Sequence, residues 1–172
     1  DQVGQNKVDV VEEQINHISP YTKVVKTTQT THQSQQDLFI NKPPLTFIVE
    51  AIDDLEGKVH LRQLAKKHTL PYVMATDVGD NVFLDIERYD LTPQPKLFNG
   101  RIKNIKSIDF KHLSLQDKIR LAMDVVGLED NSQAMLNSLY NIGETIGTWP
   151  QLGPTATIAG GVIATTLKKI IL

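Results

Sequence analysis

Hydrophobic residues recur along this chain with two different periods, and the alternation of the two periods predicts a mixed α/β fold. Apolar residues every three or four positions predict amphipathic helices, whereas short runs rich in β-branched and aromatic residues predict strands. The polar run from Thr28 to Gln36 predicts a connection that carries one helical turn before Asp37. We therefore expect helices over residues 7–18, 55–68, 115–126, 131–147 and 155–172, and strands over residues 23–27, 46–52, 72–76 and 82–87.

The order of these elements sets the expected topology. Through the strand at 72–76 the order is helix, strand, connection, strand, helix, strand, which is typical of parallel strands joined by right-handed crossovers. The segment 82–87 alternates apolar with acidic residues and predicts a half-exposed strand. The fold class is α/β, with a partly parallel sheet, crossover helices and a helical C-terminal extension. We divide the chain into an α/β unit over residues 1–90, a long irregular connection over 91–113 and the helical extension over 114–172.

Two local signals refine the helices of the extension. Ser114, with Asp117 three residues later, is typical of a capped helix start. Gly160-Gly161 lies inside the last predicted helix, where each glycine costs roughly 1 kcal/mol relative to alanine. That cost indicates close backbone packing against a neighbour. The helix that starts at Ser114 carries a stripe of apolar side chains at helical spacing: Leu115, Ile119, Ala122 and Val126.

The predicted strand over residues 46–52 ends in two carboxylates, Asp53 and Asp54. An apolar run that breaks into acids before a helix is typical of a metal- or phosphate-handling group at the carboxyl end of a strand in an open α/β sheet. The alternative is that Asp53 or Asp54 caps the helix that follows, because short acidic side chains accept hydrogen bonds from the free N–H groups of a first turn. Spacing alone favours the cap.

Composition restricts the classes of function. A chain of 172 residues with 40% hydrophobic content can bury a core as one domain, and a net charge of -2 provides no general attraction to nucleic acid. The absence of cysteine excludes disulfides, thiolate metal sites and a cysteine nucleophile, and it is consistent with a cytoplasmic protein. We expect no signal peptide and no membrane span, because the chain does not start with a charged and then apolar leader pattern and Lys168-Lys169 interrupts the longest apolar stretch.

Four motifs follow one another along most of the chain. The first is Gly4-Gln5-Asn6-Lys7, followed by Ile18-Ser19-Pro20. The second is Glu50-Ala51-Ile52-Asp53-Asp54, and the third is Leu70-Pro71-Tyr72-Val73 after an arginine-bearing helix. The last runs from Gly153-Pro154-Thr155 through Lys169. In this order they resemble the G-x-x-K helix ending in I-N-P, the D-x-x-D-N strand end, the next strand entry and the closing helix of ThiF- and MoeB-like enzymes, the bacterial relatives of ubiquitin-activating enzymes. The resemblance implies a Rossmann-like sheet.

The resemblance also implies ATP-dependent adenylation, in which a carboxylate attacks the α-phosphate of ATP bound with magnesium and forms an acyl-adenylate and pyrophosphate. Carried over by position, Lys7 would contact the ATP phosphates and Asp53 would hold the magnesium, and no catalytic residue is assigned. Lysine binds phosphate as a point charge, and phosphoryl chemistry depends on cations and on metals held by carboxylates. The alternative for Lys7 is an ordinary solvated lysine at a helix start. The carboxylate would belong to a ubiquitin-like protein tail or to a small molecule.

The sequence departs from the family pattern in several places. It lacks the preceding strand and the Gly-rich turn that holds the phosphates, so we expect it to be the carboxyl-terminal portion of such a domain. It has no cysteine for a thioester and no C-x-x-C pair for zinc, and Asp54 stands where asparagine is usual. The alternative function is therefore a non-catalytic scaffold or subunit-pairing module that no longer binds nucleotide. Because relatives are commonly dimers, we expect a homodimer or pairing with a complementary fragment.

Overall fold

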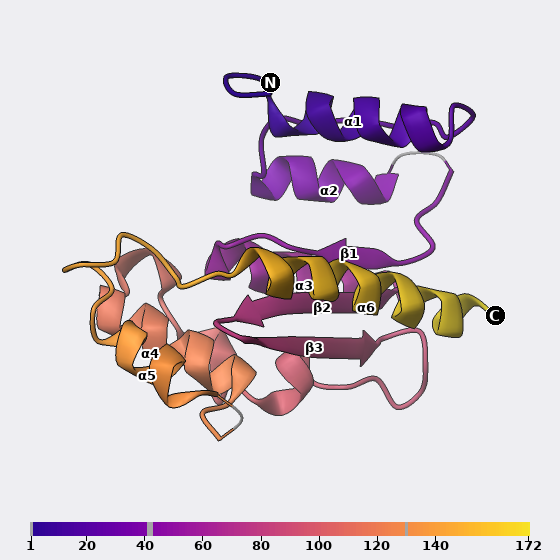
Figure 1. Ribbon diagram of the computed structural model, residues 1–172. Helices are drawn as coiled ribbons and strands as arrows, with labels where there is room; N and C mark the ends of the chain where they lie inside the picture. Colours follow the sequence, from indigo (N-terminus) through magenta and orange to yellow (C-terminus); the bar gives the residue numbers. More distant parts are fainter. Residues whose placement is uncertain (1, 41–42, 130) are drawn as a thin grey trace. The chain divides into compact units, whose positions relative to one another are not determined.

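The chain forms two compact units, residues 1–41 and 42–172, shown in the computed structural model of Figure 1. The structure describes residues 2–40, 43–129 and 131–172. The predicted division of the chain at residues 90 and 113 stays a prediction.

The first unit consists of helix α1 (Lys7–Ile18) and helix α2 (His32–Ile40), joined by an irregular segment. The strand predicted over residues 23–27 is wrong, because this segment is not in a strand. An extended segment needs a neighbouring strand to form a ladder, and the described elements of this unit are helices. Instead, the Lys26 ammonium donates to carboxylate oxygens of Asp9 and Glu12 on α1, at 2.7 and 2.5 Å.

Helix α2 is longer than the single turn expected from its polar composition. Its start is capped reciprocally: the Thr31 N–H donates to Ser34 Oγ at 2.9 Å, and the Ser34 N–H donates to Thr31 Oγ1 at 3.1 Å. Within the helix, Gln33 Nε2 donates to Asp37 Oδ1 at 2.9 Å. Caps and side-chain pairs four residues apart thus stabilise this helix, and neither is visible in a hydrophobic pattern.

The second unit contains a sheet whose described strands are β1 (Ile48–Glu50), β2 (Pro71–Val78) and β3 (Asn81–Arg88), in that order. β1 and β2 are parallel and are joined by helix α3 (Leu55–Lys67), whereas β2 and β3 are antiparallel. The turn between β2 and β3 uses Gly79 at φ +62°, a left-handed conformation that glycine adopts without strain. The expected α/β class with a partly parallel sheet is confirmed. Because β1 and β2 run in the same direction, their carboxyl ends share one edge of the sheet.

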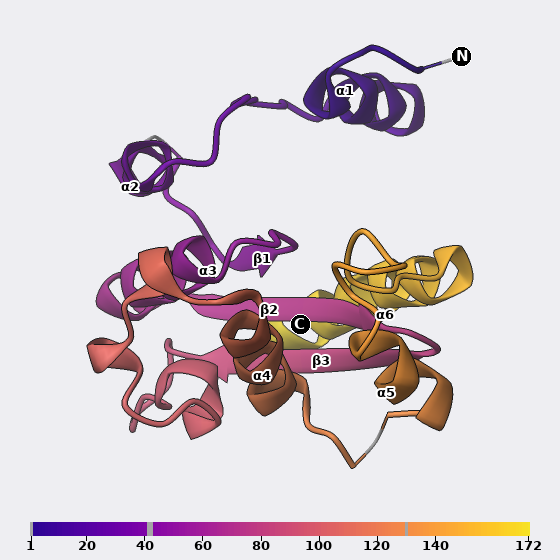
Figure 2. The same ribbon diagram turned by 90° about the vertical axis from the view of Figure 1, so that its left-hand side faces the viewer.

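Helices α3 and α6 (Gly153–Ile171) lie on opposite faces of this sheet (Figures 1 and 2). The Thr155 hydroxyl of α6 donates to the Gly79 carbonyl oxygen at 3.1 Å and ties the helix to the β2–β3 turn. The close packing expected at Gly160-Gly161 is wrong for the described chain, because a Cβ added at either glycine would meet no atom within 4 Å. None of the helices that the structure describes is long and apolar enough to cross a membrane.

Between β3 and helix α4 (Leu115–Val126), the connection contains short 3-10 helices over Ile105–Ser107 and Phe110–His112. They follow a turn over Leu97–Gly100, in which Phe98 and Asn99 have left-handed φ values of 52° and 50°. Ser114 caps α4 as predicted: its Oγ accepts a hydrogen bond from the backbone N–H of the third residue beyond it, at 3.1 Å.

Helix α5 (Gln133–Leu139) is shorter than the helix predicted over residues 131–147. Beyond it, Gly143 has φ +87°, which is incompatible with a right-handed helix. The Asn141 carbonyl oxygen accepts from the N–H groups of Thr145 and Ile146, at 3.1 and 3.0 Å. The backbone hydrogen bonds of this stretch therefore close a turn, although the apolar spacing continues.

Candidate functional site

The two carboxylates that follow β1 have different environments. Asp54 is the N-cap of α3, and its Oδ2 accepts a hydrogen bond from the Gly57 N–H at 2.6 Å. Asp53 is exposed, and its carboxylate makes no hydrogen bond or ion pair with another residue that the structure describes. The cap alternative therefore holds for Asp54, while Asp53 keeps a free carboxylate at the end of the strand.

A cavity of about 460 Å³ lies at the carboxyl ends of β1 and β2. Ligands of open α/β sheets bind at this edge, and small-molecule sites are commonly of this size. Asp53 lines the cavity together with Lys58 of α3 and Thr76 of β2. Figure 2 views the molecule from this end, with α4 in the foreground. The free carboxylate thus faces a space that a small molecule could fill.

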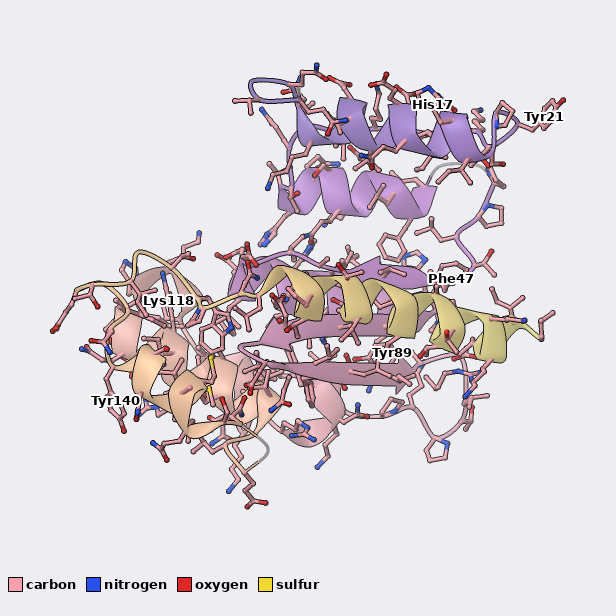
Figure 3. All side chains as sticks on the ribbon, in the orientation of Figure 1. His17, Tyr21, Phe47, Tyr89, Lys118 and Tyr140 are labelled. Atoms are coloured by element: carbon pink, nitrogen blue, oxygen red, sulfur yellow. The ribbon has the colours of Figure 1, made fainter. Side chains whose placement is uncertain are left out.

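Helix α4 forms much of the apolar wall of the cavity. The stripe predicted from the sequence faces this space, and Lys118, labelled in Figure 3, lies on the same face of the helix. The lining residues are three or four positions apart, which is the spacing of one helix face. On α4 they are Leu115, Lys118, Ile119, Ala122, Val125 and Val126.

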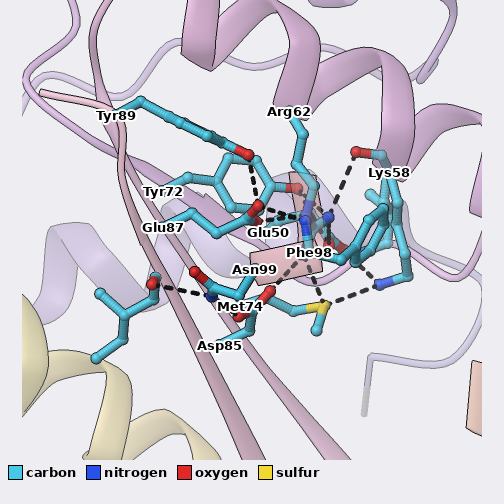
Figure 4. Close-up of polar contacts among 12 residues, drawn as sticks. Glu50, Lys58, Arg62, Tyr72, Met74, Asp85, Glu87, Tyr89, Phe98 and Asn99 are labelled. Atoms are coloured by element: carbon cyan, nitrogen blue, oxygen red, sulfur yellow. Dashed lines mark hydrogen bonds and ion pairs between the residues drawn. The ribbon is translucent and has the colours of Figure 1, made fainter. Parts of the chain in front are cut away.

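Arg62 of α3 lies at the centre of a buried cluster of charges (Figure 4). Its guanidinium forms ion pairs with Glu87 at 2.6 Å, Glu50 at 3.2 Å and Asp85 at 3.3 Å. The guanidinium also stacks on Phe98, with its central carbon 3.8 Å from the ring centroid. The cluster joins α3 to β1, to β3 and to the connection after β3.

The cluster holds the backbone that leads to Asp53. Glu50 Oε1 accepts from the Ile52 N–H and from the Lys58 ammonium, each at 2.7 Å. The other Glu50 oxygen accepts from Arg62 at 3.2 Å. Because Ile52 directly precedes Asp53, these bonds determine where the strand end leaves the sheet. They also engage Lys58, so that its charge is compensated within the fold.

Burial and charge shift the pKa values of several groups in the cluster. Burial raises the pKa of Glu87 above its ordinary value, although the adjacent Arg62 acts in the opposite direction. Burial likewise raises the pKa of Tyr72 well above its ordinary value. Burial opposes the charge of Arg62, but Tyr72 and the neighbouring carboxylates outweigh it and raise the pKa of this guanidinium. Arg62 therefore stays charged and compensates the buried acids.

Sequence reasoning did not detect this cluster. The alternating strand is confirmed as β3, but its acids face the interior: Asp85 and Glu87 are 3% and 0% exposed, whereas Ile86 is 37% exposed. The usual assignment of acids to solvent fails because Arg62 supplies a buried partner from another element. One signal was available, since Arg62 lies three positions before the buried Ala65 and so shares the inward face of α3.

Lys7, the other residue predicted to bind ATP, is the first residue of α1 and is exposed. It makes no ion pair or side-chain hydrogen bond with another described residue. Lys7 belongs to the first compact unit and Asp53 to the second. A joint role of the two residues on one ATP stays a prediction.

The donor set around Asp53 suits magnesium only in combination with a substrate. Among the described residues, no group of three or more His, Cys, Asp or Glu side chains could hold a metal ion. Magnesium, however, usually binds one or two carboxylates together with water and substrate phosphates. A single free carboxylate at Asp53 therefore fits a magnesium ion that also binds ATP phosphates.

Comparison with known proteins shows the family of this chain. The sequence profile of the ThiF family matches residues 1–172, the whole chain. The chain is 27% identical over 168 residues to "Uncharacterized protein MT1398" of Mycobacterium tuberculosis (strain CDC 1551 / Oshkosh). This alignment covers 98% of this chain and 23% of the relative, so the chain spans about a quarter of the relative's length. No solved structure matches the chain significantly. The profile match over its full length shows that this chain belongs to the ThiF family.

Proposed function

We propose that this chain is part of an ATP-dependent adenylyltransferase that activates a carboxylate as an acyl-adenylate. The free carboxylate of Asp53 beside the cavity carries the proposal, and membership of the ThiF family supports the reaction class. Asp53 would hold magnesium, Lys7 would contact the ATP phosphates, and the cavity would receive the carboxylate substrate. A cytoplasmic location, and assembly as a homodimer or with a complementary fragment, belong to the same proposal.

The reaction joins the substrate carboxylate to the AMP part of ATP. A carboxylate oxygen attacks the α-phosphorus, the bond from this phosphorus to the oxygen that bridges to the β-phosphate breaks, and pyrophosphate leaves. Bound magnesium would neutralise charge on the phosphate oxygens. The hydrogen bond from the Ile52 N–H to Glu50, at 2.7 Å, holds the strand end that carries Asp53. Such a ligand is oriented before ATP arrives and needs little reorganisation.

Substitution of Asp53 provides the direct experiment. We expect Asp53→Asn to lose the magnesium-dependent part of ATP binding, measured by calorimetry with and without magnesium. We also expect it to slow ATP–pyrophosphate exchange by about 100-fold, because metal-ion stabilisation of phosphoryl transfer amounts to several kcal/mol.

Asp54→Asn is the matched control, because asparagine is as good an N-cap as aspartate. We expect this variant to keep the fold, the magnesium-dependent ATP binding and the exchange rate. Equal loss in both variants would show that the region responds to charge in general, and an unchanged Asp53→Asn would refute the magnesium role.

The second candidate is a scaffold or subunit-pairing module that does not bind nucleotide. Helix α1 favours it, because this helix buries none of its side chains and Ile18 remains 86% exposed. Exposed apolar side chains on one element are typical of a surface that pairs with another protein. Tight binding of magnesium–ATP by this chain alone would exclude the scaffold, whereas a full-length protein that binds no ATP in the presence of magnesium would exclude the adenylyltransferase.

A further inference from the structure

The wall of the cavity is chemically unlike a triphosphate site. Phosphate groups bind to clustered N–H donors and cations, whereas most of this lining is apolar. Carboxylates of Asp53 and Asp54 occupy one side and would repel phosphates that carry no metal. The apolar part comes from α4 and from the segments on either side of it, and includes Phe98, Phe110, Leu113, Ile119, Ala122 and Ile142.

Lys118 is the cation of this cavity that is available to a ligand. Its ammonium makes no hydrogen bond or ion pair with another described residue, whereas Lys58 is paired with Glu50 at 2.7 Å. An acid that enters the cavity meets the repulsion of Asp53 and therefore needs a cation of its own. Lys118 provides that cation from within the apolar face of α4.

We infer that the cavity under α4 binds the apolar body of a small carboxylic acid and that Lys118 pairs with the carboxylate of this acid. The inference rests on the proposed function, because it names the substrate class of the same site. The apolar side chains of α4 cover the body of the acid, which removes apolar surface from water. Lys118 holds the carboxylate in its ionised, nucleophilic form at the cavity that Asp53 also lines.

A small acid suits this wall better than a protein tail does. The backbone of an extended tail brings N–H and C=O groups that lose free energy when they are buried without partners. The apolar face of α4 supplies few such partners. A small acid needs only its carboxylate satisfied, and the volume of about 460 Å³ is sufficient for its body.

Trp149 makes the occupancy of the cavity measurable. It is the only tryptophan of the 172-residue chain, and it lines the cavity. The chain is titrated with octanoate and with octanol, which share an apolar body and differ in charge, with magnesium present and ATP absent. We expect a saturable change of Trp149 emission with octanoate. Lys118→Met should weaken the binding of octanoate about three- to tenfold, which is the range between the loss of an exposed ion pair and the loss of a charge-assisted hydrogen bond. The affinity for octanol should stay unchanged.

Two further variants complete the experiment. Arg120→Met removes a neighbouring exposed cation of α4 that pairs with Asp117 and does not line the cavity, so octanoate affinity should stay unchanged. Ala122→Phe places a large side chain in the cavity and should lower the affinity for both octanoate and octanol.

Each contrary result overturns a stated part of the inference. No emission change with octanoate, or unchanged octanoate affinity in both Lys118→Met and Ala122→Phe, would overturn the acid site. Equal weakening of octanoate and octanol by Lys118→Met would overturn the charge pairing. Tighter binding of a peptide with a free carboxyl terminus than of octanoate would overturn the small-acid class. Because ATP is absent, these results are independent of any failure of ATP–pyrophosphate exchange.

Discussion

Arg62 is fully buried, and its three carboxylate partners come from β1 and β3. A buried ion pair contributes little net stability compared with apolar residues of the same volume, but the loss of one partner leaves charges buried without compensation. The main effect of Arg62 is therefore that it compensates three buried carboxylates, which would otherwise destabilise the packing of β1 and β3. Through Glu50 it also holds the strand end at Asp53.

We expect Arg62→Met to lower the free energy of unfolding by about 3–5 kcal/mol at neutral pH, the usual cost of breaking a buried ion pair. Urea unfolding measures this quantity. The control is Arg88→Met, because Arg88 forms a partly exposed pair with Asp90 at 2.6 Å. Loss of such a pair costs about 0–1 kcal/mol. Similar losses in the two variants would contradict the importance of the buried cluster.

The loss of unfolding free energy caused by Arg62→Met should depend on pH. Burial raises the pKa of Glu87 above its ordinary value of 4.5, and Arg62 opposes this rise. Without Arg62 the folded-state pKa climbs further, so the folded state binds a proton more readily than the unfolded state. Stability then falls as pH rises from the unfolded value through the folded value. We expect a smaller deficit near pH 4.5 than at pH 7, and a deficit that grows on acidification would contradict this assignment.

Among the elements, the β2–β3 turn and helix α6 use glycine for different reasons. Gly79 has φ +62°, and a Cβ there would lie 3.0 Å from Met135 Cβ of α5. Gly160 lies inside α6 with open space around it. Glycine is therefore required by the turn and is unfavourable in the helix.

We expect Gly79→Ala to destabilise the chain by about 2 kcal/mol or more, because it adds left-handed strain to a steric clash. Gly160→Ala should stabilise it by about 0.5–1 kcal/mol through helix propensity. Thermal unfolding of the two variants measures these opposite signs. A loss of stability in Gly160→Ala would show that another chain packs against this face of α6.

At the scale of the whole molecule, the two compact units each carry one residue assigned to ATP. Lys7 is at the start of α1 and Asp53 follows β1. The two residues are assigned to the same ligand, so one ATP-binding measurement tests each of them separately.

We expect Lys7→Met to weaken ATP binding about tenfold in calorimetry, the effect of one hydrogen bond from a charged donor. The exposed Lys23 of the same unit supplies the control, and Lys23→Met should leave the affinity unchanged. If Lys7→Met binds ATP as tightly as the wild type, Lys7 is an ordinary solvated lysine and does not contact the phosphates.

Much of the fold follows from local patterns. The helical spacing of apolar residues over 7–18 and 55–68 correctly predicts α1 and α3. Ser114 caps the start of α4, as its motif predicts. Predictions failed where a local pattern depended on distant partners. Residues 23–27 have no neighbouring strand among the described residues and form no ladder. The acids of β3, expected at the solvent, are buried because they pair with Arg62 of α3. Such partners are set by the packing of elements that are far apart in sequence.

The sequence alone established the α/β class, the acidic end of the central strand and the apolar stripe of α4, because each depends on residues that are close along the chain. Only the tertiary structure decided which acid is free, since Asp54 rather than Asp53 meets the Gly57 N–H. It also decided that the α4 stripe faces the same cavity as Asp53, with Lys118 beside it. The physical reason is that hydrogen-bond geometry and a cavity arise from elements brought together in space, and no single segment contains them.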